Sequence, residues 1–131
     1  MVNRMDTIQD VLLNTSDGGD FYLLLGDFLD EFYRSDSNTR QRMINTPPAS
    51  DALKDGDEYL PFAAATAHKL ANDYGLAVPG WVFEKRYYRA GSNPFFACHA
   101  KGNMRLWFMY MSPAEFKHRN LFVDKNVLSR V

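Results

Sequence analysis

The sequence predicts a mainly α-helical fold, a single-domain irregular helical bundle with a loop-rich aromatic segment at 76–102. Its 131 residues suit one domain, and 46% of them are hydrophobic, which is enough apolar material for a core. Two stretches, 20–34 and 57–75, repeat apolar residues at the spacing of an α-helix. This composition excludes a collagen-like, coiled-coil or wholly disordered chain. We therefore expect one globular domain over 1–131, with a flexible N-terminal stretch at 1–5.

The helix predicted over 20–34 has the clearest pattern. Its apolar residues recur at i, i+3, i+4, i+7, i+8 and i+11, which places them on one face of the helix. Asp20 stands where a side-chain oxygen can accept from the first free backbone N–H groups, so we predict it as the N-cap. The residues of the apolar face are Phe21, Leu24, Leu25, Phe28, Leu29 and Phe32.

Two further helices are predicted on either side of a proline-rich loop at 46–51. The first covers 37–45, is capped by Ser37 or Asn38, and ends at the loop because proline lacks a backbone N–H. The second covers 57–75, and its alanine-rich middle allows a neighbouring helix to approach closely. Gly75 provides its stop signal, since glycine adopts the left-handed conformation that ends many helices.

The remaining segments are less regular. In the segment 76–102 we favour loop with short helical turns, and the choice between helix and strand stays open for 81–111. The nearly continuous apolar run at 103–111 is interpreted as a buried helix that completes the core with the helices at 20–34 and 57–75.

The C-terminal residues carry the sequence of a capping box. Ser112 and Glu115 flank a proline at the first helical position, so we predict that the Ser112 hydroxyl accepts from the Glu115 backbone N–H. A short helix to Asn120 and a buried apolar connector at 121–123 should follow. A final short helix is expected from Asp124 to Val131.

The charges are divided unevenly along the chain, although the total is −1. Residues 1–60 hold 5 basic and 12 acidic side chains, whereas residues 61–131 hold 10 and 4. Such an asymmetry indicates either two halves that neutralise each other or a basic surface for an acidic partner. The acidic side chains of Asp27, Asp30 and Glu31 are interpreted as a solvated helix face.

The sequence lacks the usual motifs of catalysis, cofactor binding and metal binding. It contains no phosphate-binding loop, dinucleotide fingerprint, zinc-protease motif or nucleophile elbow, so we expect no catalytic residues and no cofactor. The histidines are too far apart for a zinc finger, so no metal site is expected. Adjacent Cys98 and His99 leave open an enzyme with an unrecognised site near Tyr88, although a structural cysteine fits better.

A basic and aromatic region is the candidate contact surface. Cations neutralise phosphates and aromatic rings stack on bases, which is the composition of a single-strand binding surface. The same residues can instead cover a core, with arginine and lysine stems lying on tyrosine rings. Arg119 is singled out because it lies between a capped helix and a buried turn, where it can bind exposed carbonyls or an acidic side chain of the front half. The residues of this predicted surface are Lys85, Arg86, Tyr87, Tyr88, Arg89, Lys117 and Arg119.

The C-terminal string S-P-A-E-F-K-H-R-N-L-F-V at 112–123, with L-S-R at 128–130, resembles the end of a family of small bacterial proteins of unassigned function. The segments 75–82 and 27–33 resemble the middle and front of that family, so the resemblance spans most of the chain. In that family the domain stands alone or follows a helix-turn-helix module. The resemblance implies a regulatory or antitoxin-like setting and carries over no catalytic residue.

These observations favour a non-enzymatic cytoplasmic protein, a protein–protein interaction or regulatory module whose partner is another protein or a second copy of the chain. A single cysteine favours a reducing compartment. The first ten residues lack the apolar stretch of a signal peptide, and no apolar run is long enough for a membrane helix, so no membrane partner is expected. A nucleic-acid-associated protein that uses the basic and aromatic region is the alternative.

Overall fold

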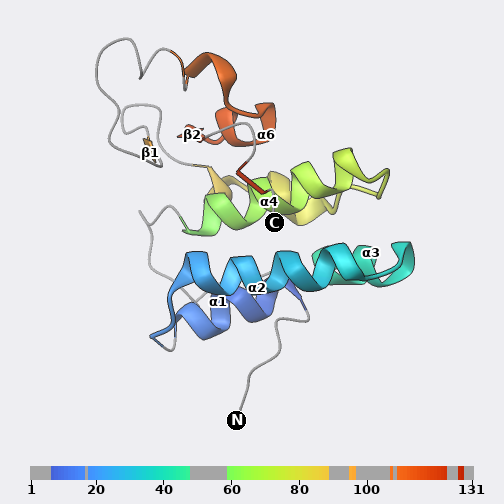
Figure 1. The fold of residues 1–131 in the computed structure, drawn as a ribbon. Coiled ribbons are helices and arrows are strands. Elements are labelled where there is room, and N and C mark those ends of the chain that lie inside the picture. Colours follow the sequence, from blue (N-terminus) through green and yellow to red (C-terminus); the bar gives the residue numbers. More distant parts are fainter. Residues whose placement is uncertain are drawn as a thin grey trace.

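The fold is mainly helical, as predicted, in a computed structural model of the chain (Figure 1). Helices α1, α2 and α3 lie on one side of α4, and the C-terminal elements lie on its other side. One hydrophobic core runs through all of them. The residues that the structure describes are 7–16, 18–47, 59–88, 95–96, 107, 109–123 and 127–128.

Helix α1 (Ile8–Ser16) precedes the first helix that the sequence analysis predicted. A capping box starts it: the Thr7 N–H donates to Asp10 Oδ2 at 3.0 Å, and the Asp10 N–H donates to Thr7 Oγ1 at 3.3 Å. Ile8 and two later apolar residues of α1 are fully buried against the other helices. A short helix with a satisfied N-terminus and one apolar face is stable here because α2 and α4 cover that face.

Helix α2 (Phe21–Arg34) has the predicted bounds and the predicted cap. The Asp20 Oδ1 atom accepts from the backbone N–H groups of Tyr22, at 3.0 Å, and Leu23, at 3.3 Å. Five of the six residues predicted for the apolar face are buried, and Leu24 is half-buried against the core. The prediction for this helix is therefore confirmed at the level of its individual residues.

Replacing Asp20 with alanine should lower the free energy of unfolding by about 1 kcal/mol, because two backbone N–H groups lose their acceptor. The measurement is urea unfolding followed by circular dichroism. Asp27→Ala is the matched control, since Asp27 is an exposed acid of the same helix outside its first turn. An equal loss in both variants would contradict a capping role and point to the net charge of the helix instead.

Helix α3 (Ser37–Asn45) has the predicted bounds, but the predicted caps, Ser37 and Asn38, are wrong. Ser37 is already the first helical residue, so the capping position belongs to Asp36, whose Oδ1 accepts from the Thr39 N–H at 2.8 Å. This hydrogen bond holds the pKa of Asp36 below its ordinary value.

Helix α4 (Tyr59–Asp73) lies at the centre of the molecule (Figure 1). Its alanines are almost completely buried, which lets the elements on both sides approach its backbone. Gly75 ends the helix at φ +69°, and the Leu76 N–H donates back to the Ala71 carbonyl at 2.9 Å. This is the left-handed termination that Gly75 predicted.

The aromatic segment contains the predicted short helical turns, η1 (Gly80–Phe83) and η2 (Lys85–Tyr87). It also contains the strand β1 (Phe95–Phe96), which pairs in parallel with β2 (Leu121–Phe122). The described residues of 81–111 therefore contain both helical turns and a short strand, where the sequence analysis had left the choice between helix and strand open.

Of the buried helix predicted at 103–111, the structure describes 107 and 109–111, and for these residues the prediction of burial is wrong. Trp107 and the residues 109–111 are helical, but the side chains of Trp107, Met109 and Tyr110 are exposed. Helix α1, which the sequence analysis did not predict, contributes Ile8, Val11 and Leu12 to the core.

The predicted capping box at Ser112 is wrong as well. The Ser112 hydroxyl donates to the Val123 carbonyl at 2.9 Å and accepts from the Val123 N–H at 2.9 Å, so it pairs with the buried connector. Helix α6 (Ala114–Lys117) follows, ends earlier than predicted, and leads through a turn to Asn120 at φ 62°. The connector at 121–123 is buried, as expected, whereas most of the final helix predicted at 124–131 lies outside the described residues.

Candidate functional site

Arg119 is fully buried between α4, α6 and η1, and it binds backbone carbonyls. Its Nη2 donates to the Val82 carbonyl at 2.7 Å, and its Nη1 donates to the Glu115 carbonyl at 2.8 Å. The prediction that Arg119 binds carbonyls is thus confirmed. Among the described residues, no carboxylate of the front half contacts Arg119. The alternative prediction, that Arg119 binds an acidic side chain of the front half, is therefore not met in this part of the structure.

The positive charge of Arg119 is compensated by dipoles and a ring. The guanidinium lies over the Tyr88 ring, with Cζ 4.7 Å from the ring centroid, in a cation–π arrangement. Its Nη1 also lies 3.3 Å from Nδ1 of His68. Burial lowers the pKa of Arg119, but Tyr88 and Glu115 oppose that shift, and a guanidinium stays protonated in proteins.

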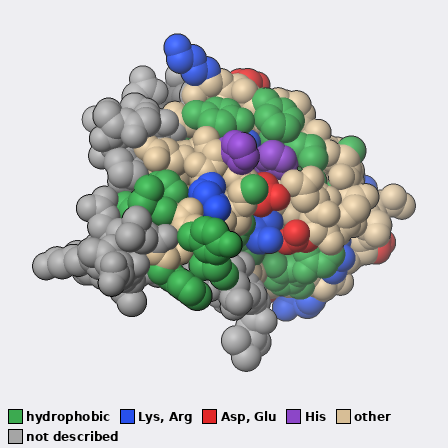
Figure 2. Space-filling model, turned by 90° about the horizontal axis from the view of Figure 1, so that it is seen from above, with side chains coloured by type: hydrophobic (Ala, Val, Ile, Leu, Met, Phe, Trp, Pro, Cys, Tyr) green, Lys and Arg blue, Asp and Glu red, His purple; other side chains and the backbone are tan. Residues whose placement is uncertain are grey.

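His68 accepts from Arg119 only when its Nδ1 carries no proton, so the arrangement favours the neutral imidazole. Burial lowers the pKa of His68, and the charges of Arg119 and His118 add to that effect, whereas Glu115 opposes it. Figure 2 shows the described histidine side chains in the middle of this face, with acidic and basic side chains close by. The face is therefore a cluster of titratable groups around one buried cation.

Glu115 completes the cluster at the surface. Its Oε2 accepts from Nδ2 of Asn72 at 2.8 Å, which ties α6 to α4. Burial raises the pKa of Glu115, but this hydrogen bond and the charges of Lys69 and His68 outweigh it, so the pKa is lowered overall.

The free energy of unfolding should fall as the pH drops below about 6.5, the ordinary pKa of His68. Because the folded protein holds that pKa lower, the unfolded chain binds the proton first, and stability is lost until the folded pKa is passed. Urea unfolding at a series of pH values measures this loss. His68→Gln should remove the His68 contribution from the curve, and an unchanged curve in that variant would contradict the assignment to His68.

The predicted basic and aromatic surface is only partly at the surface. Tyr87 is fully buried, with its ring 5.1 Å from that of Trp81, and Tyr88 is half-buried beneath the Arg119 guanidinium. Lys85 is exposed. Among the described side chains, the two tyrosine rings therefore pack within the protein and offer little face for stacking on a base.

The other predicted residues separate into two groups. Lys117 is half-buried, and its Nζ donates to the Tyr110 carbonyl at 2.8 Å. The side chain of Arg86, and Arg89 as a whole, lie outside the described residues, as do Cys98 and His99 of the enzyme alternative.

An exposed apolar patch, defined here as Trp107, Met109 and Tyr110, is the feature that sequence reasoning missed. The exposed fractions of these side chains are 57%, 45% and 78%. Next to the patch lies an open cavity of about 460 Å³. The apolar run at 103–111 is the signal in the sequence, but the pattern favoured burial and concealed this surface. The described residues that line the cavity are Met109, Ala114, Lys117, His118 and Phe122.

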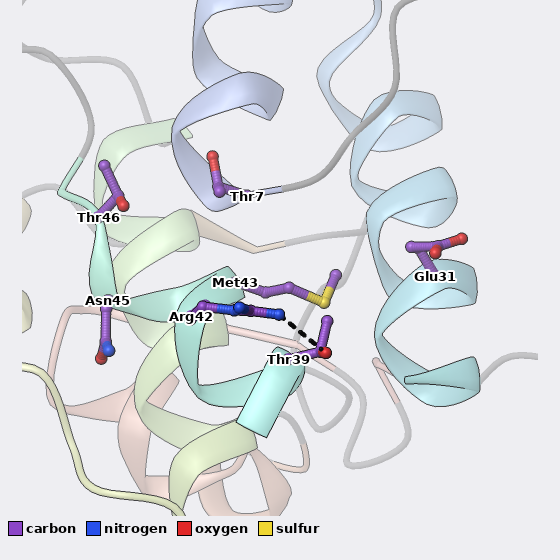
Figure 3. A pocket seen from close by; sticks show the side chains of 7 residues that line it. All are labelled: Thr7, Glu31, Thr39, Arg42, Met43, Asn45 and Thr46. Atoms are coloured by element: carbon purple, nitrogen blue, oxygen red, sulfur yellow. Dashed lines mark hydrogen bonds between the residues drawn. The ribbon is translucent and has the colours of Figure 1, made fainter. Parts of the chain in front are cut away.

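A second cavity, of about 470 Å³, lies beside the start of α1 and between α2 and α3 (Figure 3). Its charged groups do not converge: the Glu31 carboxylate points away from Arg42, and it pairs with Arg34 at 2.8 Å. Arg42 lies against Thr39, to which its Nη2 donates at 3.2 Å. The lining residues are Thr7, Glu31, Thr39, Arg42, Met43, Asn45 and Thr46.

Comparison with protein-family models, with curated proteins and with solved structures found no match to this chain. Over the part of the chain that the structure describes, no group of three or more histidine, cysteine or acidic side chains is arranged to hold a metal ion. In the same residues, no helix combines the length and the apolar character needed to cross a membrane. The exposed patch and the cavity beside it form the candidate site, because large apolar side chains are exposed there next to an open cavity.

Proposed function

We propose that the protein is a non-enzymatic, cytosolic protein–protein interaction or regulatory module and that the exposed patch is its contact surface. The observation that carries the proposal is the exposure of Trp107, Met109 and Tyr110 within four residues of sequence. Large aromatic side chains are the commonest energetic anchors of protein interfaces, and burying them against a partner removes apolar surface from water.

The patch has a fixed support, which suits a contact surface. Lys117 Nζ donates to the Tyr110 carbonyl and lies 5.9 Å from the centroid of the Tyr110 ring. Ser112 follows the helical residues 109–111, and its hydroxyl is held by two hydrogen bonds with the backbone of Val123. A supported surface loses less conformational entropy on binding than a free loop does.

The test is capture of partners by the tagged protein from its native cytosol, at low and high salt, with and without nuclease. We expect a protein partner that is retained at high salt and after nuclease, because an apolar contact depends little on salt. The double variant Trp107→Ala, Tyr110→Ala should lose it. Leu23→Ala is the matched control, since Leu23 is an exposed apolar residue of α2, on the other side of α4 (Figure 1).

Two results would overturn the proposal. One is a partner captured equally by the double variant and by the unmodified protein. The other is recovery of nucleic acid that disappears with salt and is lost when Lys85, Arg86 and Arg89 are changed to alanine, because phosphate-driven binding weakens steeply as salt is added. The second result would establish the nucleic-acid alternative.

A further inference from the structure

The cavity beside the exposed patch combines apolar walls with one cationic side chain, Lys117, and the imidazole of His118. Met109, Ala114 and Phe122 provide the apolar lining, and Lys117 and His118 provide the polar atoms. We infer that this cavity binds an acidic segment of a partner protein, which inserts one large apolar side chain between the walls and places its carboxylates near Lys117 and His118. The inference rests on the proposed function and names the chemistry of the partner.

One apolar wall of the cavity, Phe122, is held by contacts with β1. Phe122 belongs to β2, pairs with Phe96 of β1, and stacks on the Phe96 ring with centroids 5.0 Å apart. The backbone after it is held by the two hydrogen bonds between Ser112 and Val123. The cavity volume of about 460 Å³ lies within the range of sites that bury a compact ligand. The cavity is open to solvent, and its apolar lining offers a contact surface for an aromatic or long aliphatic side chain.

The charge around the cavity selects for acidic residues. No carboxylate is among the described residues that line it, while both Lys117 and His118 are. Lys117 uses one of its donors on the Tyr110 carbonyl, and an ammonium group has three, so two remain for a carboxylate. Over residues 61–131 the sequence carries 10 basic and 4 acidic side chains, an excess of the same sign as the charge of Lys117.

The apolar lining and the charge of Lys117 each disfavour a simpler kind of ligand. A free inorganic anion would leave the apolar walls in water, and a wholly apolar segment would make no ionic contact with Lys117. A segment that carries both an apolar side chain and carboxylates satisfies the two requirements together. Figure 2 shows hydrophobic side chains near the histidines on this face, with acidic and basic side chains close by.

The probe for the test is a short, labelled peptide with a central tryptophan between flanks of glutamate and aspartate, titrated with the full chain by fluorescence anisotropy. Two comparison peptides separate the contributions. In one the tryptophan is replaced by serine with the flanks kept, and in the other the acidic flanks are replaced by serine with the tryptophan kept. We expect the complete peptide to bind most tightly, with each replacement weakening binding by about tenfold or more.

Two variants locate the site without removing buried side chains. Ala114→Trp fills the cavity from an exposed position at the start of α6 and should weaken binding of the complete peptide by about tenfold or more. Lys117→Gln removes one charge and should weaken it by about threefold. Ala77→Trp and Lys85→Gln are the matched controls, because both positions are exposed and neither lines the cavity.

The inference is overturned if Ala114→Trp binds the peptide as the unmodified chain does, or if the acidic and serine flanks give equal affinity. It is also overturned if a labelled oligothymidylate displaces the peptide at equal concentration, since the cavity would then serve nucleic acid. These outcomes differ from failure of the proposed function. A partner captured from cytosol and lost in the Trp107 and Tyr110 double variant, but unaffected by Ala114→Trp, would keep the interaction surface and reject the acidic segment.

Discussion

Arg119→Ala will lower the free energy of unfolding by about 3–5 kcal/mol, because two backbone carbonyls lose a charged donor inside the protein. The Val82 carbonyl accepts at 2.7 Å and the Glu115 carbonyl at 2.8 Å, and no other side chain among the described residues replaces the guanidinium there. The substitution also removes the guanidinium that lies over the Tyr88 ring and leaves a cavity.

Two further variants separate hydrogen bonding from charge and volume. Arg119→Met keeps most of the volume and relieves the cost of a buried charge, so it should lose less stability than alanine does. Arg119→Lys keeps the charge, but one ammonium group cannot reproduce the planar fork that reaches both carbonyls, so an intermediate loss is expected. The measurement is urea unfolding followed by tryptophan fluorescence. A methionine variant as stable as the unmodified protein would show that the two carbonyl contacts contribute little.

Helices α2 and α3 could be predicted because the signals that specify their apolar faces and their ends are local in the sequence. The apolar period and the cap at Asp20 specify the helix that begins at Phe21, and the prolines after Thr46 end the next one. Helix α1 carries only three fully buried apolar side chains and was missed. Its local signals are short, a capping box at Thr7 and three apolar residues at helical spacing, and the helix also depends on the contacts of α2 and α4 that cover it.

The capping-box sequence occurs at two places in the chain but forms its hydrogen bonds at only one of them. The box that starts at Thr7 forms, whereas the one predicted at Ser112 does not. The difference is the neighbour in space: the buried N–H and carbonyl of Val123 both need a partner, and the Ser112 hydroxyl provides a donor and an acceptor at once. A capping hydroxyl can bind the N–H groups of its own helix or another buried backbone group that the fold brings near, and the two kinds of hydrogen bond compete.

The candidate site was the least predictable part, for the same reason. Arg119 could be singled out from its position in the sequence, but its partners at Val82 and His68 come from segments far along the chain. The patch at Trp107 and Tyr110 has the composition of a core segment, and only the packing of the other elements leaves it uncovered. Exposure is decided by tertiary contacts, so hydrophobicity alone cannot separate a core helix from a contact surface.

Phe62→Ala will lower the free energy of unfolding by about 3–5 kcal/mol, because the buried Phe62 ring of α4 contacts two layers: the helices α1–α3 on one side of α4 and the C-terminal elements on the other. Its ring lies 5.7 Å from that of Phe21 in α2 and 5.0 Å from that of Phe116 in α6, both in edge-to-face contact. Urea unfolding gives the loss. Phe83→Ala, at a phenylalanine that is 55% exposed, is the control and should change stability by less than about 1 kcal/mol.

The Phe62 variant also decides whether the two layers unfold as one unit. Trp81 reports from the core, where its Nε1 donates to the Ile44 carbonyl of α3, and Trp107 reports from the exposed patch. Variants that keep one tryptophan each, in the Phe62→Ala background, should show a single shared transition, because both layers bury their apolar faces in one core through α4. Separate transitions would show that the contacts of Phe62 are what couple the C-terminal elements, and hence the patch, to the stability of α2.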